Sequence, residues 1–170
     1  MIDNLTPEKN EILGELDELN SFLGLAKSLT VRDDQAKLLT GIQNNLFIVQ
    51  AEIAGVAGKI LTPGKIRHED ILSIESKTVE MEQELDELEH FIVPEGHQLA
   101  CILHVARTIA RRAERKLWPY KDRYEDLVCY LDRVACLLFA MARLVNQQNG
   151  FQEKSPAYYG RHFSERREAR

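Results

Sequence analysis

CILHVARTIARRAERKLWPY, residues 101–120, has the spacing of one amphipathic helix and holds four arginines. Arg107, Arg111 and Arg115 are four residues apart, so they form one row along a helix, and Arg112 lies about 100° round from that row. Apolar residues surround the row and leave little of the helix facing only solvent. We therefore expect some of these guanidinium groups at a helix–helix or subunit interface, where they need carboxylates or a bound anion.

The alternative interpretation of the cluster is a solvated basic face that forms surface ion pairs with acidic helices. Residues 107–116 contain five cations and Glu114, a local charge of +4 in a chain whose formal net charge is −5. Guanidinium suits phosphate because its planar fork donates two parallel charge-assisted hydrogen bonds. A local anion site is therefore a more specific prediction than a solvated basic face. The negative total charge argues against a general affinity for nucleic acid.

Helical spacing of apolar residues continues on both sides of this stretch. The pattern predicts further helices at about 6–29, 34–58, 69–90 and 121–149, and the arginine-rich helix should end near Pro119. Thr6 followed by Pro7 is a typical helix start, and Gly150 is a natural stop. In the second helix the predicted core stripe is Leu38, Ile42, Leu46, Val49 and Ile53.

The fold class that follows is an all-α, single-domain bundle of about five helices with a ferritin-like up-down architecture. The bundle should occupy residues 1–150, and residues 151–170 should form a C-terminal tail that is mobile or packed on a neighbour. No stretch approaches about 20 apolar residues, so no membrane span is expected. The first ten residues lack a signal pattern and three cysteines are too few for a disulfide scaffold, so we expect a cytoplasmic protein with reduced thiols.

Polar residues interrupt one face of the first predicted helix. Leu13, Asp17, Asn20 and Gly24 form a row beside the core stripe. A polar pair next to a glycine on a bundle helix indicates close approach by another chain or by a ligand, and the alternative is a plain exposed pair. Asp17 is the obvious carboxylate partner for the arginine row.

Metal ligation is the weaker interpretation of the histidines, and we expect no metal site. Glu87 and His90 make one Glu-x-x-His pair, whereas a di-iron carboxylate bundle needs two such pairs and two further glutamates. His97 and His104 are seven residues apart and lack a third ligand at a useful spacing. His104 lies among apolar residues and is expected to be a hydrogen-bonded core histidine.

Three stretches resemble the ATP:cob(I)alamin adenosyltransferases of the trimeric, five-helix-bundle (propanediol-utilisation) type. GELDELNSFLGLA is similar to that family's first-helix motif, Gly-x-x-Asp-Glu-Leu-Asn-Ser. FIVPEGHQLACILHVARTIARRAER resembles its most specific signature, Phe-Ile-Leu-Pro followed by His-x-x-Arg and Arg-Arg-Ala-Glu-Arg. YLDRVACLLFAMARLVN resembles its final-helix motif, so the resemblance covers about residues 11–146.

The resemblance implies an enzyme in which the cobalt of cob(I)alamin attacks the 5′-carbon of ATP and expels triphosphate, giving adenosylcobalamin. MgATP and cobalamin or a related corrinoid are the implied co-substrates, and the implied assembly is a homotrimer. A cob(II)alamin reductase or an adenosylcobalamin-dependent enzyme is an implied partner, whereas nucleic acid and membranes are not.

The same resemblance implies roles for named residues. Arg111 would pair with Asp17 of a neighbouring subunit. Phe91 would lie against the corrin and displace its lower axial ligand, which completes an implied catalytic set of Phe91, Arg111 and Asp17. His104 would be a second cobalamin contact. The implied ATP-binding residues are Arg107, Arg111, Arg112, Glu114, Arg115 and Asp132.

The chain departs from the family pattern in three places, so the adenosyltransferase is the first interpretation and two alternatives stand beside it. Asp132 stands where the family has an asparagine that faces the nucleotide, and Ala135 and Cys136 stand where it has a Ser-Asp pair. The family's Thr- and Gly-rich segment, which wraps the triphosphate, has no counterpart in MIDNLTPEKN. A carboxylate near polyphosphate is unfavourable unless Mg²⁺ or an arginine intervenes. The alternatives are a non-catalytic corrinoid- or nucleotide-binding trimer that has lost ATP turnover, and a purely structural helical assembly.

Overall fold

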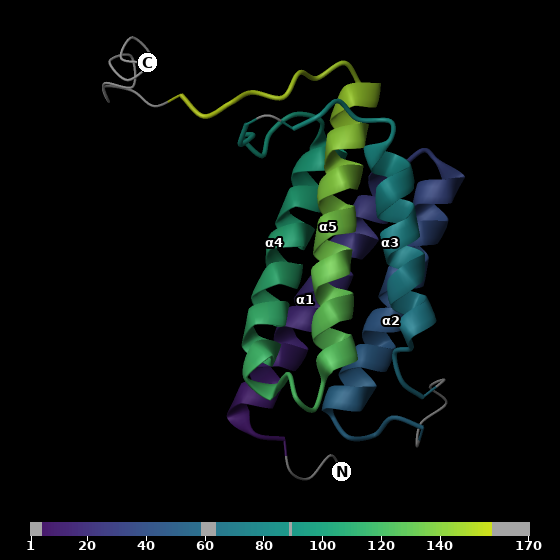
Figure 1. Ribbon diagram of the computed structural model, residues 1–170, viewed down its shortest axis with the longest axis vertical. Coiled ribbons are helices and arrows are strands. Elements are labelled where there is room, and N and C mark those ends of the chain that lie inside the picture. The colour runs from purple at the N-terminus through teal and green to yellow at the C-terminus, as the bar shows by residue number, and fades with distance from the viewer. Residues whose placement is uncertain (1–4, 59–63, 89, 158–170) are drawn as a thin grey trace, which may run out of the picture.

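The computed structural model describes residues 5–58, 64–88 and 90–157, which form an up-down bundle of five α-helices (Figure 1). No strand occurs within these ranges. The predicted all-α bundle is therefore confirmed, and the expectations for residues 1–4 and 158–170 fall outside the described part of the chain. The helices are α1 (Pro7–Leu29), α2 (Asp33–Ile53), α3 (His68–Glu82), α4 (Gln98–Leu117) and α5 (Glu125–Gln148), with one 3-10 turn, η1 (Trp118–Tyr120), between α4 and α5.

The helix ends follow local chemistry where that chemistry is strong. The Thr6 side chain accepts a hydrogen bond from the Lys9 N–H at 3.4 Å, and Pro7 is the first helical residue, as predicted. The second helix ends at Ile53 instead of residue 58, because Gly55 at φ 72° reverses the backbone and Val56 N–H donates to the Ala51 carbonyl. The last helix begins at Glu125, four residues later than predicted, because η1 and a further turn precede it.

The third helix ends at Glu82, eight residues before the predicted end at His90. The residues that follow are rich in carboxylates, which oppose the negative end of a helix dipole. Beyond the end of α3, side chains of α5 donate hydrogen bonds to backbone carbonyls. Gln147 donates to the Glu84 carbonyl and Arg143 donates to the Asp86 carbonyl, each at 2.9 Å. The chain after α3 is therefore tied to α5 instead of continuing as a helix.

The core runs along the centre of the bundle and contains apolar stripes of α1 (Ile12, Leu16, Leu19, Leu23, Ala26) and of α5 (Leu127, Leu131, Val134, Leu138, Met141, Val145). One prediction for α2 is wrong: Leu39 is fully buried, whereas Leu38 is half-buried at the edge of the core. Both positions stand at helical spacing from Ile42, so periodicity alone does not separate them.

The order of packing decides which faces can share a site. α4 packs against α1 on one side and α5 on the other, α3 packs on α5, and α2 packs on α1. The segment between α3 and α4 and the end of α5 lie at one end of the bundle (Figure 1). No helix within the described ranges is long and apolar enough to cross a membrane.

Candidate functional site

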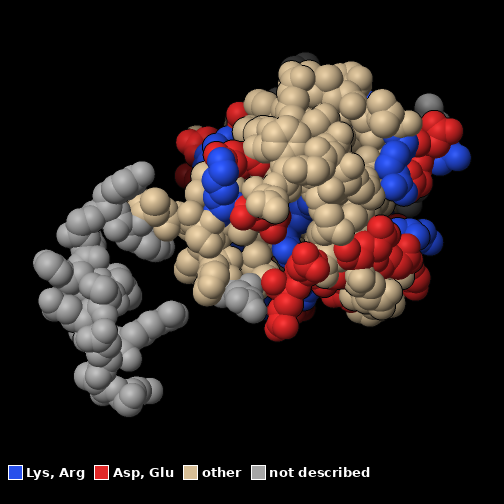
Figure 2. Space-filling model, turned by 90° about the horizontal axis from the view of Figure 1, so that it is seen from above, with Lys and Arg blue, Asp and Glu red and all other residues tan. Residues whose placement is uncertain are grey.

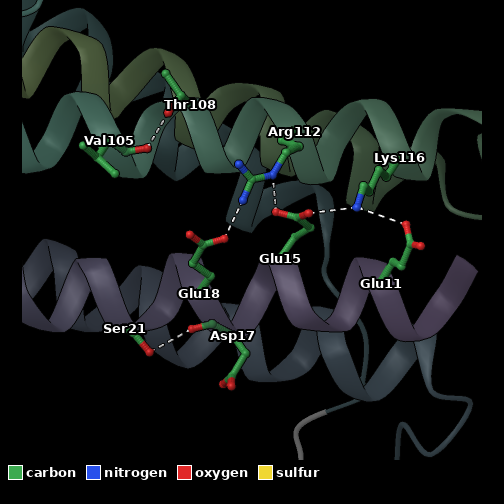
Figure 3. A network of polar contacts seen from close by, with 9 residues as sticks. All are labelled: Glu11, Glu15, Asp17, Glu18, Ser21, Val105, Thr108, Arg112 and Lys116. Carbon is green, nitrogen blue, oxygen red and sulfur yellow. Dashed lines mark hydrogen bonds and ion pairs between the residues drawn. The ribbon is translucent and has the colours of Figure 1, made fainter.

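Two cations of the basic cluster on α4, Arg112 and Lys116, form ion pairs with carboxylates of α1. Arg112 donates hydrogen bonds to Glu15 and Glu18, and Lys116 bonds Glu11 at 3.1 Å and Glu15 at 2.8 Å (Figure 3). Burial alone would raise the pKa of Glu15, but the hydrogen bonds from Lys116 and Arg112 outweigh it and lower that pKa from 4.5. The ion-pair interpretation of the cluster describes these two cations, and a nucleotide contact for Arg112 stays a prediction.

Arg111 of the same cluster faces α5. Arg111 Nη1 lies 2.7 Å from Asp132 Oδ1 and 3.2 Å from Glu114 Oε2. The Asp132 contact is a hydrogen bond, whereas Glu114 Oε2 is close to the guanidinium without hydrogen-bond alignment and is otherwise unpartnered. Asp132 also lies 3.2 Å from Arg133. A buried carboxylate and a half-buried one therefore hold Arg111 within its own chain.

Arg107 and His104 lie on α4 about one and two turns before Arg111. Both have buried nitrogen atoms without hydrogen-bond partners in the described ranges. The Arg107 guanidinium stacks 5.5 Å from the ring centre of Phe139, and its Nε has no hydrogen-bond partner within the described ranges. Burial, and then the nearby charge of Arg111, lower the pKa of Arg107. Phe139 was not identified from the sequence, although it lies seven residues after Asp132, on the same face of α5.

His104 is buried as predicted, with 4% of its surface exposed, but the expected hydrogen bonds are missing. Neither ring nitrogen has a partner among the residues that the structure describes. Burial, reinforced by the charge of Arg107, lowers the pKa of His104 to about 4, so the imidazole is neutral near pH 7. Buried polar atoms without partners are uncommon in folded chains, and a ligand or a second subunit can supply the missing bonds.

Arg115 completes the row and has its charge available. Its side chain is exposed and makes no ion pair or hydrogen bond within the described part of the chain. Arg107, Arg111 and Arg115 thus present one half-buried, one carboxylate-paired and one exposed guanidinium along a single edge of α4. This edge is the candidate anion site.

Phe91 lies at the end of the bundle where α4 begins. The side chain is 82% exposed, so the ring contributes little to the core of its own chain. Figure 2 looks down on this end and shows a central area of uncharged side chains bordered by acidic and basic side chains. The exposed aromatic ring of Phe91 is free to contact a ligand.

Asp17 and Arg111 are not brought together within one chain. The Asp17 side chain points away from α4 (Figure 3) and lines a hollow between α1 and α2 that also contains Asn20, Gly24, Gln43 and Phe47. Asn20 is buried and its Oδ1 has no partner in the described ranges. The two predicted partners therefore lie on different faces, and their pairing stays a prediction about two subunits.

Within the described ranges no three His, Cys, Asp or Glu side chains are grouped closely enough to hold a metal ion. Cys101, Cys129 and Cys136 are all free.

Comparison with known proteins gives one consistent family. A family model described as Cobalamin adenosyltransferase matches residues 8–145. A corrinoid adenosyltransferase of Bacillus subtilis is 38% identical over 148 residues, which cover 82% of this chain and 75% of the relative. The corrinoid adenosyltransferase PduO of Salmonella typhimurium is 32% identical over 161 residues, 90% of this chain and 48% of that protein.

Solved structures agree with these relatives. A variant PduO-type ATP:corrinoid adenosyltransferase from Lactobacillus reuteri, complexed with cobalamin and ATP, has a TM-score of 0.78 and 28% identity, covering 90% of this chain and 88% of that chain. A second variant, complexed with ATP, has the same TM-score with 29% identity and covers 89% of each chain.

Replacing Glu15 by glutamine tests whether the α1–α4 network stabilises the bundle. Because the folded-state pKa of Glu15 is lowered, its contribution is present above the unfolded value of 4.5 and is lost as the pH falls through the folded pKa. Glu15→Gln should therefore melt below the wild type at neutral pH, and the difference should shrink in acid. Glu11→Gln, which removes an exposed carboxylate from the same network, should change little. A Glu15→Gln difference that stays constant into strong acid would contradict this account.

Proposed function

Since this chain belongs to the cobalamin adenosyltransferase family, we propose that it transfers the 5′-deoxyadenosyl group of ATP to cob(I)alamin or a related corrinoid. A cobalt–carbon bond forms at the 5′-carbon, the bond from that carbon to oxygen breaks, and triphosphate leaves with the electron pair. The single observation that carries the proposal is the row of Arg107, Arg111 and Arg115 on α4, with carboxylates that orient its middle member.

The arginine row supports a site for the leaving triphosphate. Guanidinium groups stabilise negative charge as it develops on the phosphate oxygens, and Mg²⁺ bound to the nucleotide neutralises the remainder. Arg115 has its charge free of ion pairs within the described ranges, and the Arg107 Nε is still unpaired there. We propose that both contact the nucleotide directly. We propose that the carboxylate of Glu114, one turn along α4, helps to hold the Arg111 guanidinium in position.

Phe91 supports a corrinoid site at the end of the bundle. We propose that its exposed ring packs on the corrin and displaces the lower axial ligand, which leaves the cobalt four-coordinate and easier to reduce. His104 is proposed as a further contact, because its neutral ring offers one donor and one acceptor that the described part of the chain does not use.

A homotrimer would bring the separated faces together. Asp17 and Asn20 lie on the α1–α2 face, whereas Arg111 lies on the α4–α5 face. A contact between two different faces of identical chains is heterologous, and repeated contacts of this kind close into a ring of three when each relates neighbouring subunits by a 120° rotation. We propose a cytoplasmic trimer with its sites between subunits, supplied with reduced corrinoid by a cob(II)alamin reductase.

A non-catalytic binding trimer is the second candidate, and the Arg111–Asp132 pair favours it. A carboxylate 2.7 Å from the central guanidinium neutralises charge that the triphosphate would use. Anaerobic incubation with chemically reduced cobalamin and MgATP separates the two functions. Light-sensitive adenosylated product formed at catalytic rates supports the transferase, whereas corrinoid binding without product supports the second candidate.

Replacing Asp132 by asparagine should strengthen MgATP binding. The change removes one negative charge beside Arg111 and keeps an oxygen that can accept its hydrogen bond. We expect the KM for MgATP to fall about fivefold, equivalent to roughly 1 kcal/mol. Asp34→Asn, which removes a carboxylate from an exposed pair with Arg32, is the control. A KM that rises in the Asp132 variant alone would mean that the carboxylate is needed to orient Arg111.

Phe91→Ala should fold normally and lose most adenosyl transfer. The ring is largely exposed, so its removal leaves no cavity in the core. We expect an unchanged melting temperature and a large fall in kcat with cob(II)alamin plus reductant. Trp118→Ala removes an exposed aromatic ring from the opposite end of the bundle and serves as the control. A lowered melting temperature with unchanged turnover would assign Phe91 a structural role instead.

Asp17→Asn and Arg111→Ala should each weaken assembly. Removing one partner of a buried ion pair costs about 3–5 kcal/mol, against about 0–1 kcal/mol for an exposed pair. Sedimentation should show dissociation of both single variants at concentrations where the wild type is trimeric, and the double variant should lose less than the sum. Ser21→Ala changes the same hollow without changing charge. Zero coupling in trimers that assemble normally would show that the two residues do not meet.

A further inference from the structure

The turn before α4 is held by a single side-chain amide from α5. Asn146 Oδ1 accepts a hydrogen bond from the His97 N–H at 2.9 Å, and its Nδ2 donates to the Glu95 carbonyl at 2.8 Å. Asn146 is 3% exposed, so water cannot substitute freely for either bond. One buried amide therefore fixes the backbone on both sides of Gly96.

Gly96 is matched to this amide. Its φ of 120° lies in a region that favours glycine, and a Cβ at this position would lie 2.2 Å from Asn146 Oδ1. Immediately after it, His97 caps the N-terminus of α4 by accepting a hydrogen bond from the Leu99 N–H at its Nδ1, at 3.2 Å. The amide thus sets both the turn and the N-cap residue of α4.

A second anchor holds the other side of the same segment. The Val93 N–H donates to the Lys154 carbonyl at 2.8 Å, and the Lys154 ammonium lies 2.9 Å from Glu95. Arg143, itself mostly buried, binds both carboxylate oxygens of Glu153 at 3.0 Å. Residues 153 and 154 are therefore held against their own chain at this point, and Phe91 projects from a backbone that is restrained on two sides.

We infer that Asn146 is a positioning residue that fixes the Phe91 ring for the corrinoid, an inference that rests on the proposed adenosyl transfer. Phe91 is 82% exposed and does not pack on the core formed by the described residues, so within this part of the chain the position of the ring is set by its backbone. That restraint comes from the amide and from residues 153–154. The arginine row begins ten residues after His97, on a helix packed against both α1 and α5, so loss of the amide should leave it in place.

Asn146→Ala is the test, and Gln147→Ala is its matched control. Gln147 is the adjacent amide on α5 and also donates to a backbone carbonyl, that of Glu84, outside the 90–97 segment. Both variants are compared with the wild type in kcat, in the KM for MgATP, in corrinoid affinity and in the cob(II)alamin absorption spectrum. Hydrogen exchange of residues 91–97 reports on the anchor independently of turnover.

In Asn146→Ala we expect kcat to fall about tenfold to a hundredfold, because small displacements of a positioning group cost this much. Corrinoid affinity and the fraction of four-coordinate cob(II)alamin should fall, the KM for MgATP should stay within about twofold, and exchange at 91–97 should accelerate. Phe91→Ala combined with Asn146→Ala should be no worse than Phe91→Ala alone, because both changes act through one ring. Gln147→Ala should match the wild type in every kinetic measurement.

Three results would overturn the inference. They are unchanged exchange at residues 91–97 in Asn146→Ala, equal losses in corrinoid and MgATP affinity, and additive effects with Phe91→Ala. A wild type that forms no adenosylated product would instead defeat the proposed function, and the inference about Asn146 as a positioning residue would fall with it. Accelerated exchange would then show that the amide anchors the turn without serving this reaction.

Discussion

Carboxylates on both sides of α4 decide where its cations point, and the remaining architecture depends on that choice. Glu15 on α1 forms ion pairs with both Arg112 and Lys116, while Asp132 on α5 forms an ion pair with Arg111. Each of these pairs is partly exposed and contributes little stability by itself, so the main effect of the carboxylates is to favour one rotation of α4 about its axis. With α4 held in this way, Arg107 and Arg115 lie along one edge, the first half-buried against Phe139 and the second exposed.

Most helix ends follow from local sequence patterns, whereas the end of α3 and the choice of core residue in α2 depend on neighbouring helices. Thr6, Pro7 and Gly55 act through their own backbone geometry, so these ends follow from chemistry visible in a single segment. The early end of α3 was not foreseen because α5 supplies the donors that take its trailing carbonyls. The choice between Leu38 and Leu39 also needs the neighbouring helices, since both satisfy helical spacing.

For the candidate site, the sequence identified residues more readily than their spatial arrangement. The arginine row lies on one helix and the ring of Phe91 is exposed in the segment before it, and their functional roles stay predictions. The internal pair of Arg111 with Asp132 depends on the adjacency of α4 and α5, which spacing within one helix does not reveal. Asn146 was overlooked because a polar side chain in the last turn of a helix ordinarily faces solvent, and only the fold shows that it points inward at another segment.

The amide of Asn146 also orders events in time. It lies 49 and 51 residues along the chain from the two backbone groups that it binds, so the turn cannot take its final shape until the last helix has been synthesised and has docked. Because chains emerge from the ribosome from the N-terminus onward, α1 to α4 can meet while this turn is still open. The turn at the end of the bundle that carries Phe91 therefore takes its final shape only after the C-terminal helix has docked.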